Sequence, residues 1–259
     1  EPRRTQGPTM SRWGGQLARV LRKTTLVRAD RATGRLPVHT LTFAEPPQPL
    51  GVRIDMGDIV KIVIPNFKPK SYSVSAQREN EFDVTFKVYP GGRCSGYLDQ
   101  LEVGDEATVF RMGNKQRQAG RLVGVVAYGV GITEALPVAA AELAKPDATS
   151  VCLLWAARTM GDTFWEEKVE LLRKEHGTRF QLAKILSRDM CGGALQGRVS
   201  PEVLSKVFDG AWGTAAGGPN EAGRADARFL SVGTKQMMYD TDRMFEQIGY
   251  PMPRHKLLA

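Results

Sequence analysis

Two glycine-rich segments of the sequence have the composition of phosphate-binding turns. YGVGIT at 128–133 follows an apolar run and precedes a segment of helical spacing, so Gly129 and Gly131 lie where a strand would turn into a helix. Unpaired backbone N–H groups and the positive end of the helix dipole meet at such a turn, and a dinucleotide pyrophosphate can bind there. PGGRCSGYL at 90–98 combines backbone amides with an arginine and a serine hydroxyl, which could hold a second phosphate group. Glycine also serves turns of purely structural importance, so each segment alone leaves both interpretations open.

A third segment, PKSYSVS at 69–75, has the composition of a short strand with a cation, an aromatic ring and a hydroxyl group. Lys70, Tyr72 and Ser73 carry these groups within four positions. Together they would suit a cofactor that has both a phosphate and a planar ring system. The alternative is an edge strand with a packed tyrosine.

Up to about residue 115 the sequence predicts short β-strands, because runs rich in Val, Ile, Thr, Phe and Tyr are cut by Gly, Pro and Asp at close intervals. The clearest is FDVTFKVY at 82–89, in which apolar and polar residues alternate and so point to opposite faces of a sheet. Six such strands close most economically into a small antiparallel barrel, which we expect over residues 24–116. The predicted strands are 25–29, 38–43, 59–64, 71–75, 82–89 and 107–111.

From about residue 120 the pattern changes to apolar strand runs that alternate with segments of helical spacing. This alternation predicts a parallel sheet with helices on both faces, the α/β class, over residues 117–259. Asp162 is the expected N-cap of one helix, and Ser200, followed by proline, that of another. The small and polar stretch 211–227 is expected to be a surface insertion. The predicted strands are 122–128, 151–156, 180–186 and 228–233.

The chain has 259 residues and a formal net charge of +8, but this charge is concentrated at the N-terminus. Residues 1–28 carry a net charge of +6, which leaves +2 for the remainder, so no nucleic-acid partner is expected. We expect residues 1–23 to form a basic N-terminal arm. Its Arg-rich, acid-poor composition resembles a mitochondrial or plastid transit segment, and its apolar residues could share one face of a short helix. These apolar residues are Trp13, Leu17, Val20 and Leu21. The alternatives are a solvated tail, which leaves a cytoplasmic location open, and an arm that contacts an anionic membrane or protein surface.

Composition argues against several other classes of protein. No run approaches the roughly 18–20 consecutive apolar residues that a membrane-spanning helix needs. The three cysteines, Cys94, Cys152 and Cys191, are far apart, so we expect no disulfide scaffold, structural zinc site or iron–sulphur cluster. The three histidines are equally scattered, and we expect no bound metal.

Taken in order, these segments resemble the ferredoxin-NADP reductase superfamily, most closely its cytochrome-b5 reductase and nitrate-reductase flavin branch, over residues 24–258. The resemblance implies an FAD-binding β-barrel followed by a parallel-sheet domain that binds NADH or NADPH. KSYS at 70–73 is similar to the family's R-x-Y-[ST] motif. By this likeness Tyr72 would lie against the flavin ring, Ser73 would bond near its N5 atom, and Lys70 would hold the pyrophosphate.

Two further segments of the barrel carry the resemblance. GGRCS at 91–95 is similar to the family's G-G-x-x-S phosphate turn, and KVY at 87–89 is similar to a strand that flanks the cofactor. The residues that the first likeness places at the FAD diphosphate are Gly92, Arg93, Cys94 and Ser95. The second likeness places Lys87 and Tyr89 beside FAD, with Tyr89 on its ribityl-adenine side.

Three segments of the second domain also carry the resemblance to this family. YGVGITE resembles the family's G-G-T-G-I-T-P, AARTMGD resembles the segment after the next strand, and SVGTKQMM stands in the place of C-G-P-x-x-M. By the first likeness, the residues that would approach the nicotinamide nucleotide are Gly129, Gly131, Ile132 and Thr133. By the second likeness, the residues near the adenosine ribose would be Arg158, Thr159 and Asp162. The third puts Ser231 and Gly233 beside the nicotinamide, and Met237 or Met238 at the family's methionine.

Several positions depart from the family's motifs. Lys70 replaces an arginine and so loses the bidentate fork. Tyr128 stands in place of a glycine, Glu134 in place of a proline, and Ser231 and Val232 in place of Cys-Gly. Glu134 would also bring negative charge near a bound anion. The motifs of the flavin-binding half therefore match the family's motifs more closely than those of the nicotinamide-binding half.

The resemblance implies an FAD-dependent oxidoreductase that moves a hydride from NADH or NADPH to the flavin and then single electrons to a haem or iron–sulphur protein. Ser73 and Thr133 would orient the rings, and Ser231 would line the transfer site. The alternative is a reductase-like subunit without turnover that docks in a larger organellar complex, because the departures gather around the nicotinamide site. The choice between NADH and NADPH is open, since Arg158 could pair with a 2′-phosphate while Asp162 could disfavour it. The sequence leaves the electron acceptor, the compartment and the oligomeric state open.

Overall fold

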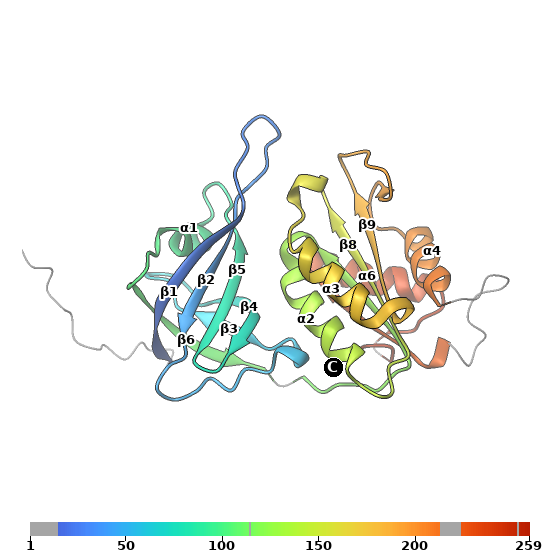
Figure 1. Cartoon of the computed structure of the whole chain (residues 1–259), viewed down its shortest axis with the longest axis horizontal. Helices are drawn as coiled ribbons and strands as arrows, with labels where there is room; N and C mark the ends of the chain where they lie inside the picture. The colour runs from blue at the N-terminus through green and yellow to red at the C-terminus, as the bar shows by residue number, and fades with distance from the viewer. Residues whose placement is uncertain (1–14, 114, 213–223, 253) are drawn as a thin grey trace, which may run out of the picture.

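The computed structural model describes residues 15–113, 115–212, 224–252 and 254–259, which form two lobes side by side (Figure 1). The first lobe is a closed antiparallel barrel with the strand order β1-β2-β5-β4-β3-β6, which confirms the predicted barrel. Its strands are β1 (Gln16–Val27), β2 (Val38–Ala44), β3 (Ile59–Ile62), β4 (Lys70–Arg78), β5 (Glu81–Lys87) and β6 (Glu106–Met112). A short helix, α1 (Arg93–Gln100), follows β5, and the 3-10 turn η1 (Ile54–Met56) precedes β3.

The alternation in β5 fills the barrel as expected. Phe82, Val84 and Phe86 are buried, and the ring of Phe82 stacks on Phe43 with centroids 5.4 Å apart. Thr85, on the opposite phase of the strand, is also buried, and its hydroxyl bonds the hydroxyls of Thr40 and Ser75. A polar position can be buried here because its hydroxyl has partners.

Strand β1 corrects the expected N-terminal arm. It begins at Gln16, so residues 16–23, which were assigned to the arm of residues 1–23, form part of the barrel. The helical face expected there is wrong: Val20 is buried whereas Leu17 is 48% exposed, as alternate positions of a strand would be. Basic residues at the outward positions gave this strand the composition of a solvated tail. Trp13 and the rest of residues 1–14 lie outside the described residues, and the organellar location stays a prediction.

The second lobe is a parallel sheet with the order β10-β9-β8-β7-β11, covered on both faces by helices (Figure 1). It confirms the predicted α/β architecture. Its strands are β7 (Leu122–Tyr128), β8 (Ser150–Ala157), β9 (Phe180–Leu186), β10 (Leu195–Gln196) and β11 (Ala227–Val232). Its helices are α2 (Ile132–Leu143), α3 (Glu166–His176), α4 (Pro201–Ala211) and α6 (Lys235–Gln247), and its 3-10 turns are η2 (Gly129–Gly131), η3 (Met160–Asp162) and η4 (Gly177–Arg179). Two separate apolar clusters, one with α2 and α3 and one with α4 and α6, form the two faces of this core.

The predicted helix starts were right in one case and wrong in the other. Ser200 caps α4, since its hydroxyl accepts a hydrogen bond from the Val203 N–H at 3.3 Å. Asp162 is not an N-cap, because α3 begins four residues later, after Trp165. Residues 213–223 of the expected insertion lie outside the described residues.

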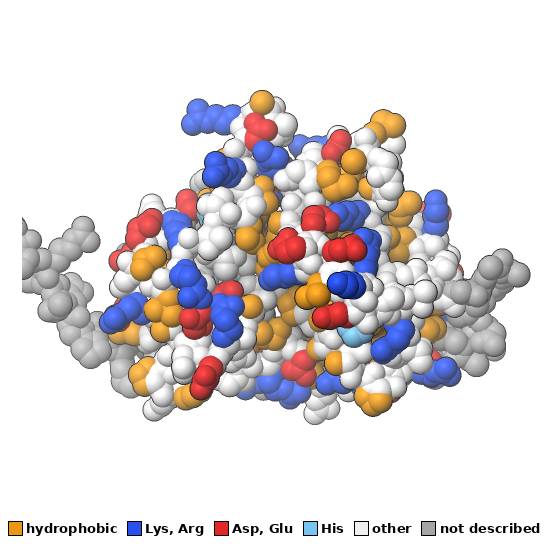
Figure 2. All heavy atoms as spheres, in the orientation of Figure 1, with side chains coloured by type: hydrophobic (Ala, Val, Ile, Leu, Met, Phe, Trp, Pro, Cys, Tyr) orange, Lys and Arg blue, Asp and Glu red, His pale blue; other side chains and the backbone are white. Residues whose placement is uncertain are grey.

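Among the described residues, none of the helices is both long and apolar enough to cross a membrane. Basic and acidic side chains are interspersed over both lobes on the face shown in Figure 2.

Candidate functional site

The first turn of α2 docks against the barrel beside the segment that resembles the flavin motif. Ser73 on β4 donates a hydrogen bond of 2.7 Å from its hydroxyl to Oε2 of Glu134 on α2. The other oxygen of Glu134 lies 3.1 Å from Nζ of Lys115, which also donates to the carbonyl of Gly57. The Glu134 side chain is 11% exposed, so this contact is largely shielded from water. The structure thus brings Ser73 together with the strand-to-helix segment that sequence analysis assigned to the nucleotide.

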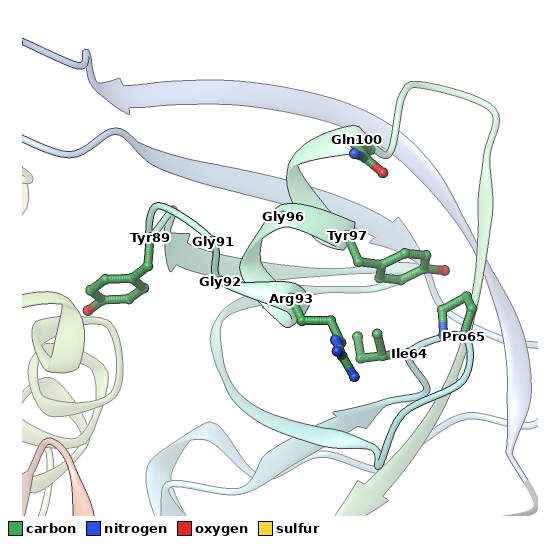
Figure 3. A pocket seen from close by; sticks show the side chains of 9 residues that line it. All are labelled: Ile64, Pro65, Tyr89, Gly91, Gly92, Arg93, Gly96, Tyr97 and Gln100. Carbon is green, nitrogen blue, oxygen red and sulfur yellow. The ribbon is translucent and has the colours of Figure 1, made fainter.

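A hollow of about 350 Å³ lies beside the N-terminus of α1 (Figure 3). Gly92 makes room at its edge, because a Cβ there would lie 2.5 Å from the Ser95 hydroxyl and 2.9 Å from the Tyr89 carbonyl. Arg93 and Tyr97 extend along one side of the hollow toward Ile64 (Figure 3). The residues that line it are Ile64, Pro65, Tyr89, Gly91, Gly92, Arg93, Gly96, Tyr97 and Gln100.

The hydroxyl of Ser95 has a local role in this turn. It accepts from the Tyr89 N–H at 3.1 Å and lies 3.3 Å from the Gly92 carbonyl, to which it donates. The guanidinium of Arg93 lies over the ring of Phe67 at 5.0 Å. Ser95 therefore shapes the turn, whereas Arg93 is the charged group at the hollow.

The side chains of the KSYS segment differ in exposure. Tyr72 is half-buried against the barrel core, where its ring meets Phe86 edge-on at 6.4 Å. Burial raises the pKa of Tyr72 well above its usual value, so the phenol stays protonated at neutral pH. Cys94 is half-buried near it, and Lys70 at the start of β4 is exposed. An aromatic ring and a free cation therefore lie on the same strand as Ser73.

Lys87, at the end of β5, bonds to the second lobe rather than pointing into an open site. Its Nζ lies 2.9 Å from Oδ1 of Asp162, and the two side chains are 11% and 4% exposed. The same carboxylate accepts from Arg158 at 3.2 Å and from the Thr159 hydroxyl at 3.0 Å. Burial raises the pKa of Asp162, but the hydrogen bonds from Lys87 and Arg158 lower it by more, so the net pKa lies below its usual value. Tyr89, two residues after Lys87, is 52% exposed and points toward the second lobe (Figure 3).

The hairpin between β1 and β2 also reaches this region (Figure 1). Arg158 donates to the carbonyl of Gly34 at 3.1 Å, and Arg35 passes so close to Gly161 that a Cβ there would lie 2.5 Å from its guanidinium. The barrel thus covers part of the segment that was expected to meet the adenosine ribose.

The turn from β7 into α2 has fewer free groups than its glycines suggested. The Ile132 N–H is bonded to the carbonyls of Gly129 and Val130, and the Ile132 side chain lies in the core. Thr133 is 3% exposed, and its hydroxyl donates to the Val130 carbonyl at 2.9 Å. Gly131 is needed for packing, since a Cβ there would lie 2.5 Å from the carbonyl oxygen of Val232. Ile132 and Thr133 were expected to contact a nucleotide directly. The Ile132 N–H and the Thr133 hydroxyl, however, already have hydrogen-bond partners within the turn.

The carboxyl end of β11 lies beside the end of β7, since Ser231 pairs with Val126 in the sheet. Ser231 is half-buried, and Gly233 follows the strand directly. The ring of Tyr128 packs on Gly233, where an added Cβ would lie 3.0 Å from it. The placement of Ser231 and Gly233 beside the nicotinamide stays a prediction, and Tyr128 was given no role there.

Four features of the site were not predicted. The partner of Ser73 is Glu134, which the sequence singled out only as a departure from a motif. Lys115 and the hairpin contact at Gly34 come to the site from distant parts of the chain, so no local sequence pattern predicts them. The far wall of the hollow, Ile64 and Pro65, lies in a loop without a motif of its own.

The residues present fit FAD better than they fit the nicotinamide ring. The hollow beside Gly92, the charges of Arg93 and Lys70 and the ring of Tyr72 suit a cofactor with phosphates and a planar ring. At the other half, the ring of Tyr128 takes the space next to Gly233.

Several known proteins resemble this chain in sequence. Residues 125–243 match the family described as the oxidoreductase NAD-binding domain. The chain is 28% identical over 217 residues to an NADH-cytochrome b5 reductase 1 of Meyerozyma guilliermondii. The aligned region covers 80% of this chain and 70% of the relative. The matches to two further fungal proteins of that name, from Lodderomyces elongisporus and Mycosarcoma maydis, span 56% and 60% of those relatives.

Solved structures show the same fold at low sequence identity. The cytochrome b5 reductase domain of Ulva prolifera nitrate reductase superposes with a TM-score of 0.72 at 18% identity, covering 96% of this chain and 99% of that one. A ferredoxin NADP+ reductase from Neisseria gonorrhoeae with bound FAD and NADP gives 0.71 at 17% identity, covering 93% and 94%.

These findings confirm the resemblance to the ferredoxin-NADP reductase superfamily and, within it, to the cytochrome-b5 reductase and nitrate-reductase flavin branch. The family match lies in the second lobe, and the solved structures show that the whole chain shares their two-lobed fold. These matches support the expectation of an NAD(P)H-dependent flavoprotein reductase with FAD and NADH or NADPH as cofactors.

Proposed function

We propose that this chain takes a hydride from NADH or NADPH onto FAD and passes electrons singly to a haem or iron–sulphur protein. FAD, when bound, supplies the change from two-electron to one-electron chemistry. The observation that carries the proposal is the contact of Ser73 with Glu134 at 2.7 Å, because it brings the flavin-motif strand to the first turn of the nucleotide-binding helix. Two cofactors held on these elements would meet at the interface between the lobes.

On this proposal the barrel residues bind and orient FAD. Lys70 and Arg93 neutralise the diphosphate, and the turn at Gly92 lets it approach the backbone. Tyr72 lies against the flavin ring, and Ser73 orients it through a hydrogen bond. The proposed supporting contacts around FAD come from Lys87, Tyr89, Cys94 and Ser95.

The second lobe binds the nucleotide. The turn at Gly129 and Gly131 receives its phosphates, and Arg158 and Asp162 lie near the adenosine ribose. Ser231 and Gly233 would flank the nicotinamide, and Thr133 would help to orient it by fixing the first turn of α2 through its bond to the Val130 carbonyl. The names of the relatives support a haem protein as the electron acceptor.

A second function is favoured by two specific observations. Tyr128 fills the space beside Gly233, and the Ile132 N–H is already bonded within the turn. A reductase-like subunit that binds flavin without turnover, and serves as a docking component of a larger complex, would have such a site.

A steady-state assay with ferricyanide separates the two functions. The protein is loaded with FAD, and oxidation of NADH and of NADPH is followed with ferricyanide as the acceptor. Turnover with either nucleotide supports the reductase. No turnover with a full load of flavin would support the second function instead.

A further inference from the structure

The sheet of the second lobe has its topological switch point between β7 and β11. From β7 the chain moves in one direction through β8, β9 and β10, and it then returns to place β11 on the other side of β7. In open α/β sheets a ligand binds in the crevice outside the carboxyl ends of the strands at such a point. Tyr128 is the last residue of β7, and Gly233 directly follows β11, so these two residues mark the crevice.

The ring of Tyr128 occupies this position. A Cβ added at Gly233 would lie 3.0 Å from Cδ2, 3.2 Å from Cβ and 3.3 Å from Cγ of Tyr128, so the tyrosine packs directly on the glycine backbone. The side chain also packs on the apolar cluster of α4 and α6. Glycine at 233 is what permits this contact, because any larger side chain would displace the ring.

A chain of hydrogen bonds holds the ring there. The fully buried Thr241 donates its hydroxyl proton to the carbonyl of Met237 at 2.7 Å. Its oxygen lies 2.7 Å from Oη of Tyr128, and since the threonine proton is already used, Tyr128 is the donor. Burial raises the pKa of Tyr128, so the phenol keeps its proton at neutral pH.

We propose that Tyr128 closes the nicotinamide end of the nucleotide site and that its ring must turn away from Gly233 before the nicotinamide can enter. The inference rests on the proposed function and deepens it, because it makes Tyr128 the residue that limits nucleotide affinity. It also gives the departure from glycine at this position a function.

The closed ring lowers the apparent affinity by the fraction of molecules in which it is turned away. Turning it out breaks the bond to Thr241 and the packing on Gly233. These losses correspond to about a tenfold decrease in affinity relative to an open site.

The test measures the dissociation constants of NADP+ and NAD+ from the flavin difference spectrum of the FAD-loaded protein. We expect Tyr128→Ala to bind at least one nucleotide about tenfold more tightly than the unsubstituted protein. Tyr128→Phe keeps the ring but loses the bond to Thr241, and it should bind about threefold more tightly. Tyr239→Ala is the matched control, because Tyr239 is exposed on α6 with Arg243 over its ring, and the nucleotide affinity of this variant should not change.

The outcomes separate this inference from the proposed function. If the unsubstituted protein binds nucleotide and its flavin is reduced, but neither Tyr128 variant binds more tightly, the proposed function stands and the role of Tyr128 is overturned. If no protein in the series binds nucleotide while all bind FAD, both the nicotinamide half of the proposed function and this inference fail. Tyr128→Phe changes a single oxygen and provides the test should Tyr128→Ala not fold.

Discussion

Lys87 of the barrel and Asp162 of the second lobe form an ion pair across the interface, with Nζ 2.9 Å from Oδ1. Both side chains are largely buried, and Arg158 and Thr159 complete the partners of the carboxylate. The pair joins two segments of the proposed site. Lys87 lies on the strand that is proposed to flank FAD, and Asp162 lies in the segment that is proposed to contact the adenosine ribose. Together with the contact of Ser73 with Glu134, the pair helps to set the relative placement of the two proposed cofactor sites.

Replacing Asp162 with Asn should weaken this junction. The change leaves the buried ammonium of Lys87 without a counter-charge, and we expect a loss of about 2 kcal/mol in the free energy of unfolding. Urea denaturation measures it. Glu106→Gln is the matched control, since Glu106 pairs with Arg19 on the surface at 3.5 Å, and it should cost less than about 0.5 kcal/mol. Equal losses for the two variants would contradict the importance of the buried pair.

The same carboxylate should produce a pH dependence of stability. Because the pKa of Asp162 is lower in the folded protein than in the unfolded chain, its contribution is present above the unfolded pKa and is lost as pH falls through the folded one. The difference in unfolding free energy between the unsubstituted protein and Asp162→Asn should be constant from pH 7 to about pH 5 and shrink below about pH 4. A difference that grows on acidification would show the opposite sign.

Gly57→Ala should disturb the contact between Ser73 and Glu134. Gly57 has a φ of 58°, and a Cβ there would lie 2.6 Å from Oε1 of Glu134. Gly91 has a similar φ of 67° with nothing within 4 Å, so Gly91→Ala measures the backbone strain alone. We expect Gly57→Ala to lose about 1 kcal/mol more than Gly91→Ala in thermal or urea unfolding. Matching losses would mean that Glu134 moves aside without consequence.

Lys70→Arg should tighten FAD binding. Arginine restores a planar fork that can hold two phosphate oxygens, whereas lysine offers a point charge. We expect the dissociation constant of FAD, measured from its fluorescence, to fall about threefold or more. Lys68→Arg, also exposed and two residues earlier, is the control and should leave it unchanged. If both variants bind FAD like the unsubstituted protein, Lys70 does not contact the diphosphate.

Arg158→Ala tests the choice of nucleotide. If Arg158 pairs with a 2′-phosphate, its loss should lower kcat/KM for NADPH about tenfold more than for NADH. Arg173→Ala is a suitable control, since Arg173 pairs with Glu170 on the exposed face of α3. An unchanged ratio of the two efficiencies would remove the proposed role of Arg158 and leave it as a partner of Gly34 and Asp162.

The fold could be predicted wherever local pattern decides structure. The alternation around Phe82 and the apolar run of β7 predicted strands at the observed places, because side-chain period follows backbone geometry. Strand β1 was missed up to Thr24, because its outward positions are basic and its inward residues, Ala18 and Val20, are small.

The site was predictable only in its separate segments. The turn at Gly92 and the strand with Tyr72 and Ser73 were found from composition and resemblance. The pairings of Ser73 with Glu134 and of Lys87 with Asp162 join residues 61 and 75 positions apart, and no local pattern specifies such contacts. The closing of the crevice by Tyr128 depends in the same way on the neighbouring strand β11.

On the proposed function, the barrel binds FAD and a nicotinamide nucleotide reduces it at the interface between the lobes. The most direct measurement is the visible absorption spectrum of the purified protein supplied with FAD, before and after anaerobic addition of NADH and then NADPH. We expect flavin bands that remain with the protein and are bleached by at least one nucleotide. Bound flavin that neither nucleotide bleaches, or a protein that retains no FAD, would contradict it.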